Sequence, residues 1–440
     1  MQGLAVWFAV LLAAMGLGAQ SSRGGRAVCP AGKGGTKGRA IPPPLQWLGP
    51  RRSSRQAPAS ARQAAFRRLE RAGYQAFYNL NYAATLADFH RLLRLAPNDP
   101  EVWNHLAQAR LYQEMYRVGA LQLSLYGKHN GFFRARRRPL DPRADAAFLA
   151  ADRRARRLAQ RELAHGSPDA EAQYALAAAW GLQGTYDFTL RKAYFAALGD
   201  AVKAARYARA AARARPGWAA PQLILGVHDY IAGSLPWTVR WLAHMAGFSG
   251  SRREGLERLQ RIAVSGAPER VEAQILLAVI DRRQGWNRRA AAWLRGLRRQ
   301  YPGNALFAAA LAATEEAAGE HRRALADYRW LARAPHSDAP SYAQLPWARI
   351  WYQVGAIHRR LGQSAAALRA YARAEQVPGA PARWRQKAAL ASGEIEDAAG
   401  RRQAAVADYR RCIARNPASP QARAARRWLR QAYDPPGQHQ

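Results

Sequence analysis

Two short amphipathic helical patterns, joined by a turn at Gly285, occupy residues 271–302. Small side chains at Ala278 and Ala290 allow two antiparallel helices to approach closely, and leucines on both helices fill the contact between them. A single hairpin of this length cannot bury its own apolar face. The sequence therefore predicts that further hairpins stack against this one.

The same pattern recurs three more times towards the C-terminus. Gly319 lies 34 residues after Gly285 (319 − 285), and further turn glycines follow at Gly362 and Gly400. Each turn glycine precedes an alanine by five residues, and a proline follows each second helix. The pattern resembles the tetratricopeptide repeat. An unrelated bundle of Ala-rich helices is the alternative, but it does not explain a glycine turn followed five residues later by an alanine in four places.

The resemblance implies an all-α fold in which antiparallel helix pairs stack into a right-handed superhelix, a tetratricopeptide-type α-solenoid. We expect an irregular insertion in its middle and a capping helix after its last pair. The expected order along the chain is a signal peptide (1–19), a disordered leader (20–61), N-terminal repeats (62–131), an irregular helical middle (132–268), a regular array with its capping helix (269–433), and a tail (434–440).

The N-terminal residues 4–17 form an uninterrupted apolar run that is too short to span a membrane comfortably. Gly16, Gly18 and Ala19 suit a signal-peptidase site, so we predict a cleaved signal peptide and a periplasmic or secreted protein. No Lys or Arg precedes Arg23, which leaves an uncleaved N-terminal anchor or a start codon placed too late as alternatives. The Gly-, Pro- and Arg-rich leader lacks the apolar content needed to fold.

Basic residues outnumber acidic ones by a wide margin, 68 to 30, for a formal net charge of +38. Only six of the basic residues are lysine, and a composition rich in Arg and Ala is also what a GC-rich genome produces. Codon bias does not account for the shortage of acidic residues. A surface with this charge favours anionic partners: phospholipid headgroups, lipopolysaccharide phosphate, acidic polymers, or nucleic acid if the protein stays inside the cell.

The most distinctive segment of the chain covers residues 223–259. Here a proline can begin a short helix, a Gly-Phe-Ser-Gly run ends it, and Ser251 can cap the helix that follows. The segment resembles the tetratricopeptide-repeat-39 and inclusion-body-clearance family, which implies a repeat scaffold tied to lipid surfaces and not an enzyme. The matching residues are Gly226, Ser234, Leu235, Pro236, Gly247, Phe248, Gly250, Arg252 and Gly255. Ser251 stands where an acidic residue is expected.

The inserted apolar helix, residues 235–247, has two interpretations. We favour a plug that begins at Pro236 and packs Trp237 and Trp241 inside the superhelix, with Phe248 at its end. The alternative is an interfacial helix whose tryptophans meet lipid headgroups with the help of nearby arginines.

No motif for catalysis, for a cofactor or for a metal ion is recognisable in the sequence. His228 and Asp229 are adjacent, but a lone histidine on such a helix is more often a hydrogen-bonded core group. In tetratricopeptide proteins the first helix of each pair lines the concave binding surface, where Arg and Tyr are strong anchors for peptides and acidic ligands. The candidate binding residues on these helices are Arg282, Arg349, Tyr352, Arg359 and Lys387.

The sequence thus predicts a non-enzymatic scaffold that binds protein segments or acidic ligands in the cell envelope. One alternative is a membrane-surface adaptor that uses helix 235–247 and the basic surface. Another is a cytoplasmic repeat protein that binds nucleic acid through its positive charge, which requires an unprocessed N-terminus. We favour a protein or peptide partner of anionic character over nucleic acid, and the oligomeric state stays open.

Overall fold

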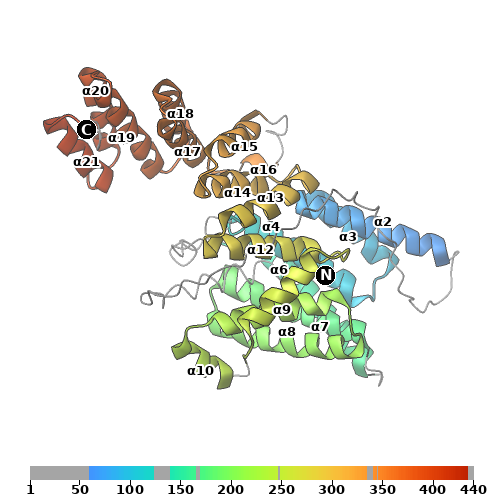
Figure 1. The fold of residues 1–440 in the computed structure, drawn as a ribbon. Coiled ribbons are helices and arrows are strands. Elements are labelled where there is room, and N and C mark those ends of the chain that lie inside the picture. The colour runs from blue at the N-terminus through green and yellow to red at the C-terminus, as the bar shows by residue number, and fades with distance from the viewer. Residues whose placement is uncertain are drawn as a thin grey trace, which may run out of the picture. The chain divides into compact units, whose positions relative to one another are not determined.

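The computed structural model describes residues 59–122, 139–164, 169–245, 248–333, 340–343 and 345–434. Every regular element in these ranges is helical, which confirms the predicted all-α fold. The chain forms two compact units, the first ending at Tyr301 and the second beginning at Pro302. Figure 1 labels the helices of both units.

Within the described residues, the first unit contains five antiparallel helix pairs. The pairs are α2–α3, α4–α6, α7–α8, α9–α11 and α12–α13, and each pair packs against the next. Helix α10 is inserted between α9 and α11, and the π-helical turn η3 follows α7. The bounds are α2 Ala59–Tyr78, α3 Tyr82–Leu95, α4 Pro100–Arg117, α6 Pro142–Ala164, α7 Ala170–Tyr186, η3 Asp187–Arg191, α8 Tyr194–Ala214, α9 Ala219–Ser234, α10 Trp237–Met245, α11 Arg252–Ala263, α12 Arg270–Gln284 and α13 Asn287–Gln300.

The second unit contains three further pairs, α14–α15, α17–α18 and α19–α20, with the short helix α16 between the first two. Helix α21 packs on α19 and α20 and ends the array, as predicted for a capping helix. The bounds are α14 Ala305–Ala317, α15 His321–Arg333, α16 Pro340–Ala343, α17 Trp347–Arg360, α18 Ser364–Gln376, α19 Ala382–Ala398, α20 Arg402–Arg415 and α21 Pro420–Arg430.

The predicted turn glycines end the first helix of their pairs. Gly285, Gly319, Gly362 and Gly400 all have positive φ, between 71° and 82°, a conformation in which glycine avoids the clash of a Cβ atom. Alanines five residues later are fully buried where the two helices of a pair meet. The helix pairs therefore have the tetratricopeptide-type arrangement that the sequence predicts.

A small residue on the first helix faces an aromatic ring on the second helix in several pairs. A Cβ atom added to Gly355 would lie 2.4 Å from the ring of Tyr371, and one added to Gly393 would lie 2.5 Å from the ring of Tyr409. Gly73 faces Phe89 in the same way in the first pair, at 2.4 Å. Because these contacts leave no room for a side chain, glycine sets the closest approach of the two helices.

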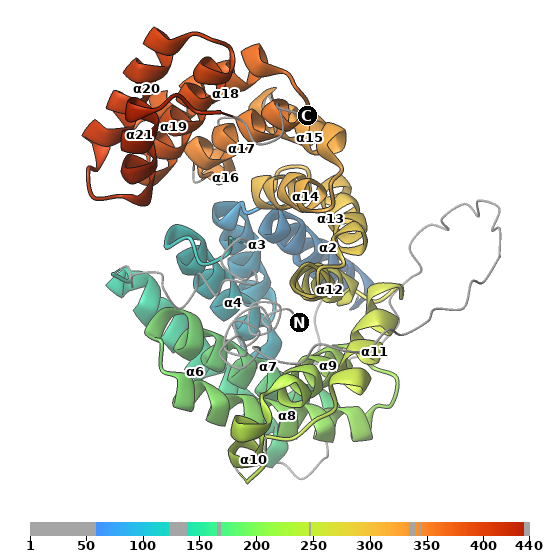
Figure 2. The ribbon, with the colours of Figure 1, turned by 60° about the vertical axis from the view of Figure 1, so that its left-hand side comes forward.

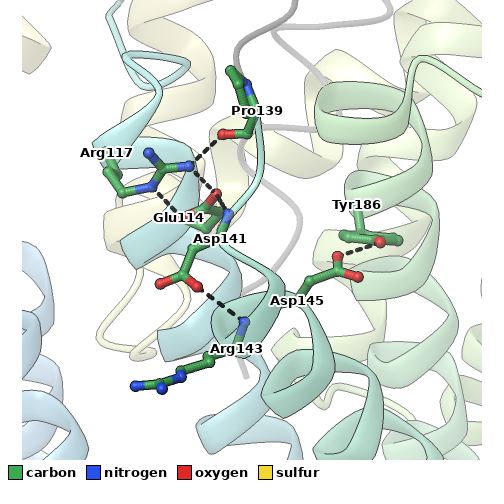
Figure 3. A network of polar contacts seen from close by, with 7 residues as sticks. All are labelled: Glu114, Arg117, Pro139, Asp141, Arg143, Asp145 and Tyr186. Atoms are coloured by element: carbon green, nitrogen blue, oxygen red, sulfur yellow. Dashed lines mark hydrogen bonds and ion pairs between the residues drawn. The ribbon is translucent and has the colours of Figure 1, made fainter.

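Helix α4 pairs with α6, which follows it after a long connection. The sequence does not reveal this pairing. Arg117 donates two hydrogen bonds to Glu114, at 2.7 and 2.6 Å, and one to the carbonyl oxygen of Pro139, at 2.6 Å. Glu114 also accepts from the backbone amide of Asp141 at 2.9 Å. Figure 3 shows how these contacts hold the start of α6 beside the end of α4, while Asp145 on α6 accepts a hydrogen bond from Tyr186.

The first and last pairs of the first unit contact each other. Tyr78, at the end of α2, donates a hydrogen bond from its hydroxyl to Glu272 on α12. The ring of Tyr78 also lies 4.8 Å, centroid to centroid, from that of Tyr301. Figure 2 shows α2 beside α12 within this unit. Burial raises the pKa of Glu272 well above its ordinary value, because a charged carboxylate is poorly solvated inside the unit.

Several sequence predictions fall outside the described residues. These are the signal peptide 1–19, most of the leader 20–61, and all but the first residue of the tail 434–440; α2 begins at Ala59, within the end of the predicted leader. The predicted division at residues 131 and 268 stays a prediction. The structure adds that 132–268 also contains paired helices.

Candidate functional site

A groove in the second unit is lined mainly by the first helices of successive pairs. Helices α17 and α19 supply most of its residues, and Tyr371 and Gln421 complete it from α18 and α21. Its volume is about 580 Å³. We call this the first-helix groove. The polar lining residues supplied by α17 and α19 are Tyr352, Arg359, Arg360, Lys387 and Glu394.

Aromatic rings and cations lie close together where Tyr352, Tyr371 and Lys387 line this groove. The ring of Tyr352 lies 5.6 Å from that of Trp384 and 5.7 Å from that of Tyr371. The Lys387 ammonium lies 4.9 Å from the Trp384 ring and 5.8 Å from the Tyr352 ring. Arg349 places its guanidinium 5.7 Å from Trp384. Cations over aromatic faces in this way are stabilised by the ring quadrupole and remain available to an anion.

The other side of the groove is held by an internal ion pair. Arg359 donates to Glu394 at 2.6 Å and to the hydroxyl of Tyr433 at 3.2 Å. Burial alone would lower the pKa of Arg359, but its hydrogen bond to Glu394 raises the pKa overall. Burial, with the nearby Glu394 charge, also raises the pKa of Tyr352, so its hydroxyl stays protonated. The charge of Arg359 is therefore compensated by Glu394 inside the protein. Lys387 and Arg349 instead lie against the Trp384 ring, so Glu394 compensates their charge less.

The structure brings together four of the five binding residues predicted from the sequence. Tyr352, Arg359 and Lys387 line the first-helix groove, and Arg349 reaches its aromatic side through Trp384. Arg282 lies on α12 in the first unit and is not part of this groove. Trp384, which the sequence analysis missed, is three residues before Lys387 on α19. Side chains three positions apart lie on the same face of a helix, so this spacing could have indicated that Trp384 lies beside Lys387.

Several acidic side chains in both units form ion pairs while the carboxylate itself is largely buried. Asp281 and Asp397 are fully buried, whereas their partners Arg289 and Arg402 are 44% and 37% exposed. Glu375, on α18, is likewise 10% exposed. Because the carboxylates lie inside and the guanidinium groups outside, the surface is more cationic than the composition alone implies.

Helix α10 exposes its tryptophans, which contradicts the plug interpretation that we favoured from the sequence. Trp237, Trp241 and Met245 are 78%, 64% and 71% exposed, and they recur every four residues on one face of the helix. Arg240 on the same helix is also exposed. Pro236 precedes the helix at a half-buried position.

The physical reason is the close approach of α9 and α11, which leaves no room for a plug. A Cβ atom on Gly233 would lie 2.1 Å from the backbone nitrogen of Arg252, and one on Gly255 would lie 2.3 Å from that of Tyr230. Ser251 caps α11, as predicted, by accepting from the amide of Glu254 at 3.3 Å. Gly233 and Gly255 of the distinctive segment thus serve this helix contact, whereas Gly247 lies outside the described residues.

Phe248, unlike the tryptophans, is buried. It is 1% exposed, and its ring lies 4.6 Å from the ring of His228 on α9. His228 also lies 3.3 Å from Asp229, through Nδ1 and Oδ1. Phe248 and His228 are therefore core contacts that anchor the chain just after α10.

The described residues contain no group of three or more His, Cys, Asp or Glu side chains placed to hold a metal ion. Within the same ranges, no helix combines the length and apolar character needed to cross a bilayer. Cys412 is a free, buried cysteine, and burial raises the pKa of its thiol to about 11. What the described sites offer is charge and aromatic surface for binding.

Comparison with solved structures finds helical-repeat proteins. The chain is similar to "Crystal structure of APC/C hetero-tetramer Cut9-Hcn1", at 13% identity and a TM-score of 0.40, over 83% of this chain and 55% of that one. It is also similar to a tetratricopeptide repeat protein from Parabacteroides merdae, at 12% identity and a TM-score of 0.25, over 74% of this chain and 98% of that one. The chain thus spans about half the length of the first structure. No family model and no curated protein matches the chain.

Proposed function

We propose that this chain is a non-enzymatic scaffold that binds acidic segments of other proteins in the first-helix groove. The observation that carries the proposal is the row of Tyr352, Trp384 and Lys387, in which a cation sits over two aromatic faces at the side of a groove. Aromatic and cationic side chains of this kind dominate binding energy at protein interfaces. The positive surface would also speed the encounter with an acidic partner.

The groove can be tested with short fluorescent peptides. Fluorescence anisotropy would compare an acidic peptide containing aromatic residues with the same peptide after its acids are replaced by amides. We expect Lys387→Gln and Trp384→Ala each to weaken binding of the acidic peptide about 10-fold, the usual loss for an anchor side chain.

Lys203→Gln is the matched control, because the Lys203 ammonium also lies over a tryptophan, 3.9 Å from the Trp180 ring, but in the first unit. It should bind the acidic peptide like the unaltered chain. The proposal fails if Lys387→Gln and Lys203→Gln have equal effects, or if the amide peptide binds as tightly as the acidic one.

We also propose that the protein acts in the cell envelope, as a periplasmic or secreted protein. The apolar run at residues 4–17 and the small residues after it support this placement. Intact-mass measurement of the native protein would show the loss of residues 1–19. A full-length mass together with recovery in the cytoplasm would contradict export and would favour the nucleic-acid alternative instead.

A second candidate function, attachment to a membrane surface, is favoured by the exposed face of α10. Trp237, Trp241 and Met245 present apolar surface beside the exposed cation of Arg240, a combination suited to the headgroup boundary of an anionic membrane. Sedimentation with phosphatidylglycerol vesicles would test it. Trp237→Ser with Trp241→Ser should abolish pelleting, whereas Trp286→Ser, which removes an exposed tryptophan elsewhere, should not. Unchanged pelleting of the double variant would discard this function.

A further inference from the structure

A second groove in the C-terminal unit lies between the second helices of two pairs. Helices α15 and α18 form its walls, and α17 forms its floor with Trp351, Val354 and His358. The volume is about 560 Å³, within the range of small-molecule sites. We call this the second-helix groove. It is distinct from the first-helix groove, with which it shares no lining residue.

Four arginines line the walls of the second-helix groove. Arg329 and Arg333 lie one turn apart on α15, and Arg369 and Arg373 lie one turn apart on α18. No acidic side chain is among the lining residues. Within the described part of the chain, none of the four arginines forms an ion pair with a carboxylate.

In the next pair along the array, two arginines in a similar position are neutralised by a carboxylate of the chain itself. Arg411 and Arg415, also one turn apart on α20, both face Glu375 on α18. The Arg415 guanidinium lies 2.8 Å from the Glu375 carboxylate, and that of Arg411 lies 3.7 Å from it. Among the described residues, the α15–α18 gap has no such carboxylate. Within that part of the chain its four positive charges are therefore not neutralised internally, and they suit an added anion.

The floor of the groove adds an apolar surface beside these charges. The guanidinium of Arg373 lies 4.7 Å from the centre of the Trp351 ring, and Trp351 in turn stacks on Trp347 with centroids 6.4 Å apart. His358 is tied to Gln363 by a 2.6 Å hydrogen bond and is nearly buried. The floor is thus preorganised, and its aromatic face can support the non-ionic part of a ligand.

We propose that the second-helix groove binds a compact ligand carrying two or more phosphate groups. One arginine guanidinium can donate two parallel hydrogen bonds to the oxygens of a phosphate. A terminal phosphate carries a charge of about −1.5 to −2 at neutral pH. Four guanidinium groups therefore match two phosphates in charge. The phosphates can belong to a soluble molecule or to a lipid headgroup, because both present the same oxygens to the groove.

Isothermal titration calorimetry with inorganic pyrophosphate as the probe tests this assignment on the full chain. Arg329→Gln with Arg369→Gln should weaken pyrophosphate binding about 100-fold, because each lost charge-assisted contact is worth roughly 10-fold. Arg410→Gln with Arg430→Gln is the control, since it removes the same charge from exposed arginines of the same unit that line neither groove. It should change the affinity less than about 3-fold. Circular dichroism would verify that both double variants stay folded.

Sedimentation with phosphatidylcholine vesicles, with and without cardiolipin, separates the two sources of phosphate. Pelleting that requires cardiolipin and is lost in Arg329→Gln/Arg369→Gln, without pyrophosphate binding, assigns the groove to a lipid headgroup. The proposal is overturned if neither probe binds, or if the two double variants lose affinity equally. It is also overturned if a single-stranded oligonucleotide binds the groove more tightly than pyrophosphate does.

Discussion

Replacing Gly393 by alanine should destabilise the second unit, although alanine favours helices. A Cβ atom at this position would lie 2.5, 2.8 and 3.0 Å from three carbon atoms of the Tyr409 ring, where ordinary contacts are about 3.5–4.0 Å. The ring is fully buried, and its hydroxyl donates to Asp397 at 2.9 Å. It therefore cannot move away without loosening that hydrogen bond.

The size of the effect follows from two opposing contributions. Overpacking of a buried site costs about 1–3 kcal/mol, and loosening the Tyr409 hydrogen bond adds about 1 kcal/mol. The higher helix propensity of alanine returns about 1 kcal/mol. We therefore expect Gly393→Ala to lower the free energy of unfolding by about 1–3 kcal/mol, measured by urea titration with far-UV circular dichroism.

Two further variants decide whether steric conflict is the cause. Gly296→Ala, on α13, adds a methyl group that meets no atom within 4 Å, so it should be neutral or stabilising. Adding Tyr409→Leu to Gly393→Ala should recover part of the lost stability. Residues 393 and 409 are 16 positions apart (409 − 393), and the α12–α13 pair already has alanine and leucine at the same spacing, at Ala278 and Leu294 (294 − 278). The reasoning is refuted if Gly393→Ala is as stable as the unaltered chain.

Three other predictions concern buried polar groups. Burial raises the pKa of Asp152 from its ordinary value of 3.8 to about 7. The stability that its protonation contributes is therefore complete below pH 3.8 and is lost as the pH rises to 7. Asp152→Asn should flatten the decline in melting temperature over that range. The Cys412 thiol, whose pKa burial raises to about 11, should react with a disulfide reagent at pH 8 only after urea is added. Gln386→Leu should cost about 1–3 kcal/mol, because the Gln386 amide donates to the carbonyls of Cys412 and Asn416 at 2.9 and 3.0 Å.

Each of these three has a clear contrary result. An unchanged pH profile in Asp152→Asn would show that another group controls stability between pH 4 and 7. Rapid modification of Cys412 in the folded chain would mean that α20 opens readily. A Gln386→Leu variant with an unaltered unfolding transition would show that water replaces the lost hydrogen bonds.

The first-helix groove was largely predictable because the repeat fixes which helix lines it. Once α17 and α19 are known to be first helices, Tyr352, Arg359 and Lys387 fall on the same side of the array. The sequence could not show that Arg359 is committed to Glu394, because the two residues are 35 positions apart and meet only when neighbouring pairs stack. The second-helix groove was missed for the same reason, since its walls come from different pairs.

Helices and their recurring glycine turns were determined by the sequence itself, because backbone conformation depends on neighbouring residues. The positive φ of Gly285 and the burial of Ala290 follow from that local pattern. Only the tertiary structure decided that Trp237 and Trp241 face outwards, because that depends on how closely α9 and α11 approach. The same holds for the partner of α4 and for the four arginines without an internal carboxylate, since packing between distant segments determines which charges are compensated.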